Sequence, residues 1–543
     1  MIMTHEEILK KRILEALSKL GLTLQENDIV IERSRDPLHG DYASNVAMKF
    51  FRLSNMKSPR DFASALASSI EDETIEKIEI AGPGFMNFFM KKDLLQGVVK
   101  HVLEAGDEYG RNPKKGCKIN VEYVSANPTG DLHLGHTRCA AIGDCIANIL
   151  DWAGYDVTRE YYVNDCGNQV EHLGHSIRAR YHELYGEPLQ LDDDDYHGED
   201  LIAIAKSIKE QYGDAYLKDS QESHDFFIRF GIDTELAKIK KDLADFRVHF
   251  DVYTYESDIR KAGTIEKTIE ELKDHTYTKE GALYLRTTDY LDDKDRPIVK
   301  SDGLYTYFMP DICYHYDKMA RGFDHLIDIL GSDHHGYIAR MKSALMMKGY
   351  DQDVLEAQFV QVVHVFKDGE EVKMSKRTGK AIAHRDLVED VGVDAVRYLF
   401  VERSQSSHLD FNYNLAMEQS SANPVYYAQY AHARCASLLS LGQDIPLDPS
   451  AKLLKEESEM SILKHLAAFS SMIDNAARDR APYKVAAYIH HLGELIHEFY
   501  ASCRIIDRNN IPLTSSRLAL IKAAEITLKN ALGILGVTAP EKM

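Results

Sequence analysis

Residues 125–136 (SANPTGDLHLGH) constrain the fold of this chain more than any other segment. They follow the apolar run 119–124 and open a long segment with helical apolar spacing, so they predict a strand, a tight turn and a helix start. A helix start carries unpaired N–H groups and a partial positive charge, which attract phosphate. His133 and His136 add donors on the first helical turn, and Gly135 lets a flat base lie against the backbone. We prefer this nucleotide site to a pair of satisfied core histidines, because strand, turn and helix context agree.

A second segment, residues 373–379 (KMSKRTG), carries three cations beside Ser, Thr and Gly. It follows a predicted strand at 359–366 and an Asp-Gly turn. A Lys/Arg cluster alone is usually a solvated surface loop. Beside a phosphate-attracting helix start, the same cluster predicts a triphosphate clamp formed by Lys373, Ser375 and Lys376.

The two segments resemble the HIGH and KMSKS signatures of class I aminoacyl-tRNA synthetases, here HLGH and KMSKR. Further stretches resemble arginyl-tRNA synthetases, in the right order: 121–129 (VEYVSANPT), 302–307 (DGLYTY) with 311–312 (DI), 331–337 (GSDHHGY) and 423–434 (NPVYYAQYAHAR). The resemblance extends from about residue 4 to the last residue. It implies an arginine–tRNA ligase that forms arginyl-adenylate from L-arginine and ATP and transfers arginine to the 3′-terminal ribose of tRNA(Arg), releasing AMP and pyrophosphate.

The predicted fold class is α/β, with a Rossmann-like parallel sheet. Runs at 119–124, 135–153 and 158–163 give strand, helix and strand, which is one βαβ unit. The flanking regions are interpreted as an N-terminal α+β domain and a C-terminal all-α bundle, which bind tRNA and its anticodon in the resembled family. We therefore expect an N-terminal tRNA-binding domain, two catalytic halves separated by an insertion, and an anticodon-binding bundle, at 1–112, 113–165, 166–300 (the insertion), 301–409 and 410–543.

A guanidinium is planar and always charged, so paired carboxylate oxygens hold it best. Asp311 lies four residues after Tyr307, on one face of a predicted helix. The resemblance implies that the arginine-binding residues are Glu122, Tyr307 and Asp311 for the guanidinium, and Ser125, Asn127 and His136 for the amino and carboxylate groups.

The resemblance also assigns residues to ATP and to tRNA. The ATP-binding residues are Thr129, His133, Gly135, His136, Gly331, Asp333, His334, Lys373, Ser375 and Lys376, and the catalytic residues among them are His133, His136, Lys373 and Lys376. The tRNA-binding residues are Phe85 and Asn87 in the N-terminal domain and Tyr427, Tyr430 and Arg434 in the bundle. Aromatic and guanidinium planes can hold splayed bases. Ordinary core packing is the alternative for these aromatic residues.

The net charge of −21 opposes binding to RNA, but binding depends on local basic stripes rather than on the sum. Seven cysteines without a Cys-x-x-Cys pair argue against disulfides and a zinc site, and no protein-bound metal is expected. The resemblance implies ATP with Mg²⁺ as the cofactor. The acidic run 191–195 is interpreted as a solvated loop rather than a metal site. No apolar run is long enough for a membrane span. The scattered single cysteines fit a reducing cytoplasm, and the resemblance implies a monomer.

Three alternatives stay open at this stage. Another class I synthetase, such as the cysteinyl type, would need clustered Cys and His ligands. A tRNA-independent nucleotidyltransferase of the same superfamily would not need the C-terminal helical region. A degenerate RNA-binding relative would not need intact HLGH and KMSKR segments.

Overall fold

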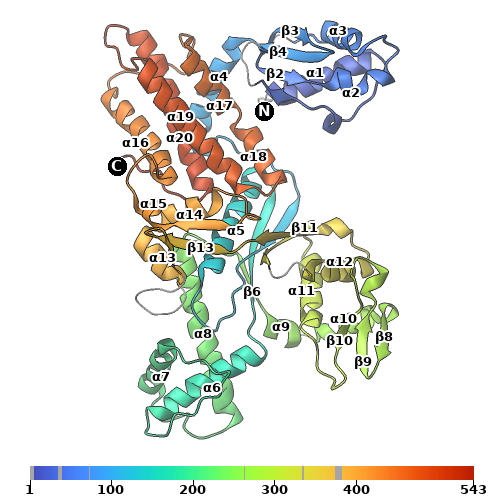
Figure 1. Cartoon of the computed structure of the whole chain (residues 1–543), viewed down its shortest axis with the longest axis vertical. Coiled ribbons are helices and arrows are strands. Elements are labelled where there is room, and N and C mark those ends of the chain that lie inside the picture. The colour runs from blue at the N-terminus through green and yellow to red at the C-terminus, as the bar shows by residue number, and fades with distance from the viewer. Residues whose placement is uncertain (1–4, 35–38, 73, 262, 333–335, 373–381) are drawn as a thin grey trace.

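The computed structural model describes residues 5–34, 39–72, 74–261, 263–332, 336–372 and 382–543. Its centre is a five-stranded parallel sheet in the order β12-β11-β5-β6-β7 (Figure 1). The strands are β5 (Lys118–Glu122), β6 (Asp156–Val163), β7 (Val252–Tyr255), β11 (His325–Gly331) and β12 (Leu355–Val360). The predicted parallel sheet is therefore confirmed. The strand β7, which falls within the predicted insertion, forms one edge of this sheet.

The helix α5 (Leu134–Trp152) joins β5 to β6 and is buried along most of its length. Its close contact with the sheet depends on Gly143, because a Cβ there would lie 2.3 Å from a ring carbon of Tyr123. Tyr123 is only 1% exposed, so the ring has no room to withdraw. This contact fixes the helix that begins at the HLGH segment against the strand that precedes it.

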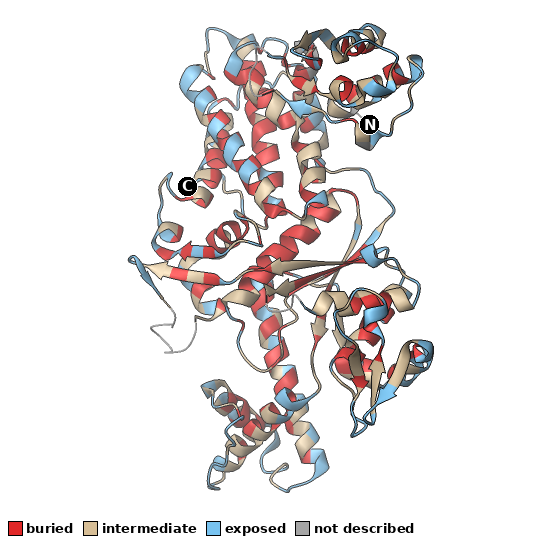
Figure 2. Cartoon of the chain, turned by 45° about the vertical axis from the view of Figure 1, so that its right-hand side comes forward, coloured by how far each residue is buried: buried red, intermediate tan, exposed pale blue. Residues whose placement is uncertain are grey.

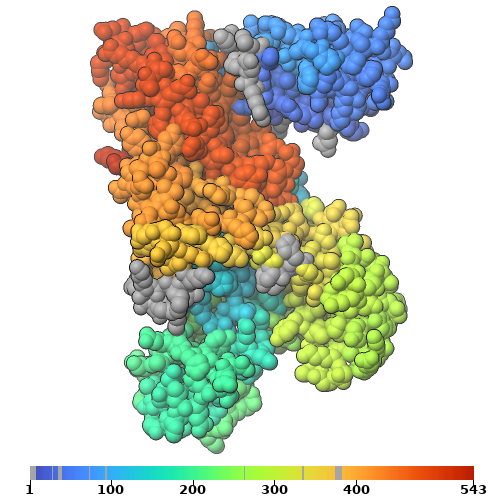
Figure 3. All heavy atoms as spheres, in the orientation of Figure 1, coloured from blue at the N-terminus to red at the C-terminus, as the bar shows by residue number. Residues whose placement is uncertain are grey.

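Two small units extend from the sheet, each with its own hydrophobic core. The first contains α6 (Asn168–Glu183), α7 (Glu199–Tyr212) and α8 (Gln221–Asp245). The second packs helices against a three-stranded antiparallel sheet and contains α9 (Glu256–Lys261), α10 (Thr264–Glu271), β8 (Thr276–Lys279), β9 (Ala282–Leu285), β10 (Arg296–Val299), α11 (Phe308–Ala320) and α12 (Tyr337–Met347). Figure 3 shows the surface hollowed between these two units.

The predicted single strand at 359–366 is wrong: the chain forms β12 and then β13 (Val363–Lys367), with a break at Gln361 and Val362. The two strands belong to different sheets, since β12 pairs with β11 while β13 pairs with β14 (Glu370–Glu371) and β15 (Leu409–Asn412). The guanidinium of Arg138, 0% exposed, donates to the Gln361 carbonyl at 2.8 Å and stabilises the break.

The N-terminal unit contains a four-stranded antiparallel sheet in the order β1-β2-β4-β3, and its helices pack on one face of that sheet. Its elements are α1 (His5–Lys19), β1 (Glu32–Arg33), β2 (Tyr42–Ser44), α2 (Val46–Phe50), α3 (Pro59–Ser69), β3 (Ile75–Ala81) and β4 (Phe85–Met90). The next helix, α4 (Lys92–Ala105), packs on the C-terminal bundle instead. There the Gln96 amide donates to the Leu454 carbonyl at 2.8 Å.

The C-terminal region is helical after β15, as expected (Figure 2 shows its buried inner faces). The helices from the catalytic region onward are α13 (His384–Val391), α14 (Val393–Val401), α15 (Tyr413–Met417), α16 (Pro424–Leu441), α17 (Glu457–Ala467), α18 (Phe469–Arg478), α19 (Pro482–Ser502) and α20 (Ile511–Ile534). Buried Arg397 links this bundle to α5, because its guanidinium donates to the Leu535 carbonyl at 2.8 Å and pairs with Asp144. Among the described residues, no helix has the length and apolar character to cross a membrane.

Candidate active site

A cavity of about 940 Å³ lies at the carboxyl ends of β5, β11 and β12. This is where open α/β sheets bind their ligands. Its wall contains seven of the predicted site residues: Glu122, Ser125, Asn127, His133, Gly135, His136 and Gly331. Thr129, Tyr307 and Asp311 are not on the wall, and Asp333, His334, Lys373, Ser375 and Lys376 lie outside the described residues.

The two histidines of HLGH form a reciprocal cap at the start of α5. Nδ1 of His133 accepts from the backbone N–H groups of Gly135 (3.0 Å) and His136 (3.3 Å), and Nδ1 of His136 accepts from the backbone N–H of His133 (3.4 Å). The rings stack with centroids 3.6 Å apart. Burial lowers the pKa of both, that of His136 to about 3, so both imidazoles are neutral at pH 7. Because each Nδ1 is an acceptor, each proton resides on Nε2, which is left as a donor.

Gly135 is required for this cap as well as for room in the cavity. A Cβ at this position would lie 2.9 Å from Cε1 of His133. Any side chain would therefore displace the imidazole that caps the helix.

Both flanks of residues 373–381 reach this cavity, and the downstream flank also contacts the helix start. His133 forms an antiparallel bridge with Ala383, and the His384 backbone N–H donates to the Leu132 carbonyl at 2.7 Å. On the upstream side, the Val372 N–H donates to the Val365 carbonyl at 2.7 Å. Glu371, Val372 and Ile382 line the cavity. Thus the two segments that are remote in sequence converge on one cavity up to the edges of the described residues.

The turn after β5 bends sharply through two consecutive residues in left-handed backbone conformations, Val124 (φ 70°) and Ser125 (φ 38°). Such positions cost about 1–3 kcal/mol each and persist where surrounding contacts enforce them. Here the Ser125 hydroxyl donates to Oε1 of Glu122 at 3.0 Å and accepts from the Tyr162 N–H at 3.1 Å. The strained turn therefore holds a hydroxyl and a carboxylate together on the cavity wall.

Glu122 is also bound from beneath the wall by Lys318, which the sequence did not single out. Nζ of Lys318 lies 2.5 Å from Oε2 of Glu122 and 3.1 Å from Oδ1 of Asp328. Nε2 of His315 lies 2.9 Å from the other oxygen of Asp328. Burial lowers the pKa of Lys318, but the carboxylates of Asp328 and Glu122 outweigh it and hold that pKa above its ordinary value. Lys318 is thus a buried cation.

Asp311 lies in the first turn of α11, near Glu122 and Glu256. Burial raises the pKa of its carboxyl to about 7; a hydrogen bond with Tyr337 opposes the rise and the two neighbouring carboxylates add to it. Tyr307, at the N-cap of the same helix, is 72% exposed. Asn127, predicted to bind the amino and carboxylate end of arginine, donates its side-chain amide to Oε1 of Gln169 at 2.6 Å.

The predicted tRNA-binding residues do not line this cavity and belong to the N-terminal unit and the C-terminal bundle. Phe85 is 39% exposed at the start of β4, whereas Asn87 is buried at 6%. In the bundle, the guanidinium of Arg434 stacks on the rings of Tyr430 (5.0 Å) and Tyr500 (4.4 Å).

The remaining member of that set, Tyr427, packs on His490 and its hydroxyl bonds His497 at 3.0 Å. Sequence reasoning missed Tyr500 and His497, although their spacing on one face of α19 was a usable signal.

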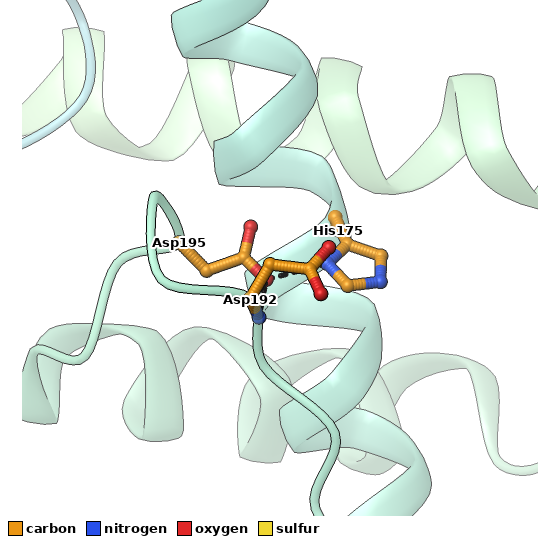
Figure 4. Close-up of side chains that lie close together, drawn as sticks. All are labelled: His175, Asp192 and Asp195. Atoms are coloured by element: carbon orange, nitrogen blue, oxygen red, sulfur yellow. Dashed lines mark hydrogen bonds and ion pairs between the residues drawn. The ribbon is translucent and has the colours of Figure 1, made fainter.

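Within the described residues, one group approaches metal-binding geometry: His175, Asp192 and Asp195 (Figure 4). The Asp195 carboxylate accepts from Nδ1 of His175 at 2.6 Å, from the Asp192 backbone N–H at 2.8 Å and from Nδ1 of His172 at 3.2 Å. These bonds satisfy both of its oxygens. They hold the end of the acidic run against α6.

Comparison with known proteins covers the whole chain. A model of the class I tRNA synthetase (R) catalytic domain matches residues 98–438, a model of the arginyl tRNA synthetase N-terminal domain matches 7–90, and a model of the DALR anticodon binding domain matches 428–543. The arginine–tRNA ligase of Bacillus subtilis (strain 168) is 47% identical over 550 residues, covering 99% of each chain. That of Geobacillus kaustophilus (strain HTA426) is 47% identical over 551 residues, again with 99% of each chain.

Among solved structures, arginyl-tRNA synthetase of Thermus thermophilus shares the fold, with a TM-score of 0.79 at 21% identity, covering 99% of this chain and 100% of that one. The full-length matches, the three domain models in order and the cavity behind HLGH lead to one conclusion: this chain belongs to the arginyl-tRNA synthetase family of class I aminoacyl-tRNA ligases.

Proposed function

We propose that this chain joins L-arginine to tRNA(Arg) at the cavity around HLGH, in two steps. In the first, a carboxylate oxygen of arginine attacks the α-phosphate of ATP, a new P–O bond forms, and the bond to pyrophosphate breaks. In the second, a hydroxyl of the terminal ribose of tRNA attacks the arginyl carbonyl carbon and AMP leaves. The observation that supports this most is the meeting of the HLGH imidazoles, Glu122 and both flanks of residues 373–381 on one cavity wall.

Charge development on phosphate needs donors and cations rather than a side-chain nucleophile. His133 and His136 present neutral Nε2–H donors at a helix start, where the helix dipole adds to their effect. Lys373, Ser375 and Lys376 supply the remaining cations and donor from the KMSKR segment. ATP enters as its Mg²⁺ complex, in which phosphates and water supply most of the ligands of the ion.

The arginine end is proposed to lie deeper, towards Glu122 and Asp311, with Tyr307 closing the outer side. Ser125, Asn127 and His136 face the amino and carboxylate groups, and Thr129, Gly331, Asp333 and His334 complete the nucleotide side. A guanidinium paired with two carboxylates excludes neutral analogues, because an unpaired buried charge is costly. Discrimination on this basis needs no editing domain.

The tRNA is proposed to lie along the N-terminal unit and the helical bundle. Tyr430 and Arg434 form an exposed stacking surface with Tyr500, suited to unpaired bases of the anticodon loop. Phe85 is exposed for the same purpose on the N-terminal unit. The same proposal has the enzyme acting as a cytoplasmic monomer, with no zinc.

Arginine-dependent ATP–pyrophosphate exchange, measured with and without tRNA(Arg), tests the function. We expect exchange with arginine that requires tRNA, by resemblance to the family. Exchange with cysteine in place of arginine would select another class I synthetase. Exchange that needs no RNA and yields no aminoacylated tRNA would select a nucleotidyltransferase, and no exchange under any condition would select a non-catalytic relative.

A further inference from the structure

A buried lysine lies beneath an acidic wall that is proposed to bind a cation, which is an unexpected arrangement. Lys318 is 0% exposed, and its ammonium is 2.5 Å from Oε2 of Glu122 and 4.4 Å from the ring centroid of Tyr314. Desolvation of an ammonium is expensive and persists only where carboxylates compensate it. Here two carboxylates do so, those of Glu122 and Asp328.

The two oxygens of Glu122 have different environments. Oε2 is bound by Lys318, which lies outside the cavity wall. Oε1 is bound by the hydroxyl of Ser125, which, like Glu122, lines the cavity. Oε2 is therefore on the buried side of the wall, and Oε1 is the oxygen that faces a ligand.

The charged and titratable groups around Lys318, Glu122 and Asp311 come from several elements. They are Glu122 on β5, Glu160 and Tyr162 on β6, Glu256 on α9, Asp311, Tyr314 and His315 on α11, Arg321 at the C-terminal end of α11, Asp328 on β11 and Tyr337 on α12. The Arg321 guanidinium donates to both carboxylate oxygens of Glu160, each at 2.9 Å. His315 and Lys318 both form ion pairs with the carboxylate of Asp328. The charge of Glu122 is then already shared with Lys318, whereas the positive group that acts on Asp311 is His315.

We propose that Lys318 is a positioning residue for arginine selection: it fixes Glu122 with Oε1 towards the cavity and offsets its charge, so that the site accepts one guanidinium and no second cation. This inference rests on the proposed function. It assigns Lys318 no contact with arginine. Its effect reaches the substrate only through the orientation and the charge of the Glu122 carboxylate.

Removal of the Lys318 ammonium should leave the Glu122 carboxylate without its buried partner. In Lys318→Met, Glu122 and Asp328 face each other in a dry interior, so one of them takes up a proton. Glu122 then presents either a neutral acid or a rotated carboxylate. We expect the KM for arginine in ATP–pyrophosphate exchange to rise about 10- to 100-fold, with the KM for ATP within about twofold.

The pH profile separates positioning from general support of the fold. In Lys318→Met, the dependence of the arginine KM on pH should change shape, because the Glu122 carboxylate has lost the ammonium that pairs with it, whereas a loss of general support for the fold would raise the KM equally at every pH. Arg321→Met is the matched control, since it removes a cation at the C-cap of the same helix, three residues after Lys318 in the sequence. It should leave the arginine KM within about twofold.

Several results would overturn the proposal. A folded Lys318→Met enzyme with an unchanged arginine KM is one, and an equal rise in the KM of both substrates is another. If Lys318→Met does not fold, Asp328→Asn tests the same idea: Lys318 then neutralises Glu122 alone, so the arginine KM should rise several-fold with the ATP KM unchanged, and no rise would reject the proposal. Failure of the unaltered protein to show arginine-dependent exchange would instead reject the proposed function.

Discussion

At the scale of single residues, the proposed arginine site includes a carboxyl with a raised pKa. Burial raises the pKa of Asp311 to about 7. If Asp311 binds the guanidinium as proposed, the bound cation favours the ionised form and lowers that pKa in the complex. Arginine binding is then coupled to loss of a proton, so the affinity is full above pH 7 and is lost as the pH falls below it.

The first prediction follows from that linkage. The arginine KM in the exchange assay should fall about tenfold per pH unit as the pH rises from 5 to 7, and level off above 7. Asp311→Asn should raise the KM and flatten this dependence, while the KM for ATP stays near normal. A pH-independent arginine KM in the unaltered enzyme would remove Asp311 from the binding site.

The second prediction separates the two roles of His133, which caps α5 through Nδ1 and offers Nε2–H to the cavity. His133→Asn keeps a capping oxygen and should leave the free energy of unfolding nearly unchanged, whereas His133→Ala should cost about 1 kcal/mol. Both should lower kcat for adenylate formation by about 10²–10³. The measurements are urea denaturation and exchange kinetics.

Retention of kcat in His133→Asn would show that the imidazole acts only as a cap. An unchanged free energy of unfolding in His133→Ala would show that the Nδ1 bonds contribute little.

At the scale of elements, the sequence predicted the βαβ unit well, because its strands, turn and helix have strong local signals. The observed α5 (Leu134–Trp152) differs from the predicted 135–153 by one residue at each end. The break between β12 and β13 could not be foreseen, since it depends on Arg138 reaching across from α5 to the Gln361 carbonyl. Local sequence carries no trace of such a contact.

The same limit applies to the site. The HLGH residues were predictable because a helix start and its cap are local features. Lys318 was not, because a lysine in a helix pattern is usually solvated, and only the sheet register brings Glu122 on β5 and Asp328 on β11 to it as direct pairing partners.

The third prediction concerns the contact between α5 and β5. Gly143→Ala places a methyl group against the Tyr123 ring and should destabilise the protein by about 1–3 kcal/mol. Gly97→Ala is the matched control: Gly97 lies in α4 with open space around its Cα, so alanine should stabilise by about 0.5–1 kcal/mol. Urea midpoints measure both. Equal effects of the two substitutions would reject the packing argument.

At the scale of the whole molecule, the net negative charge of the chain does not describe every part of its surface. The net charge is −21, yet half-buried Arg434 lies between the exposed rings of Tyr430 and Tyr500 on the bundle. If that surface stacks on tRNA bases, its contribution is confined to tRNA binding. The amino acid and ATP are handled elsewhere in the molecule.

The fourth prediction tests this separation. Tyr430→Ala should raise the KM for tRNA in aminoacylation by about tenfold, through loss of one stacked base. The KM values for arginine and ATP should not change. Leu441→Ala, an exposed position (67%) on the same helix, is the control and should leave all three constants unaltered. A tRNA KM unaffected by Tyr430→Ala would place the anticodon elsewhere.

The link between Arg397, Leu535 and Asp144 has a mechanical consequence. The chain's last helical turn is tied to the middle of α5, and the first turn of α5 is capped by an imidazole of the cavity. The helix α5 thus has its first turn at the proposed reaction site and its middle bound to the C-terminal bundle. If tRNA binds the bundle as proposed, a displacement of the bundle on binding would also displace the imidazoles at the start of α5.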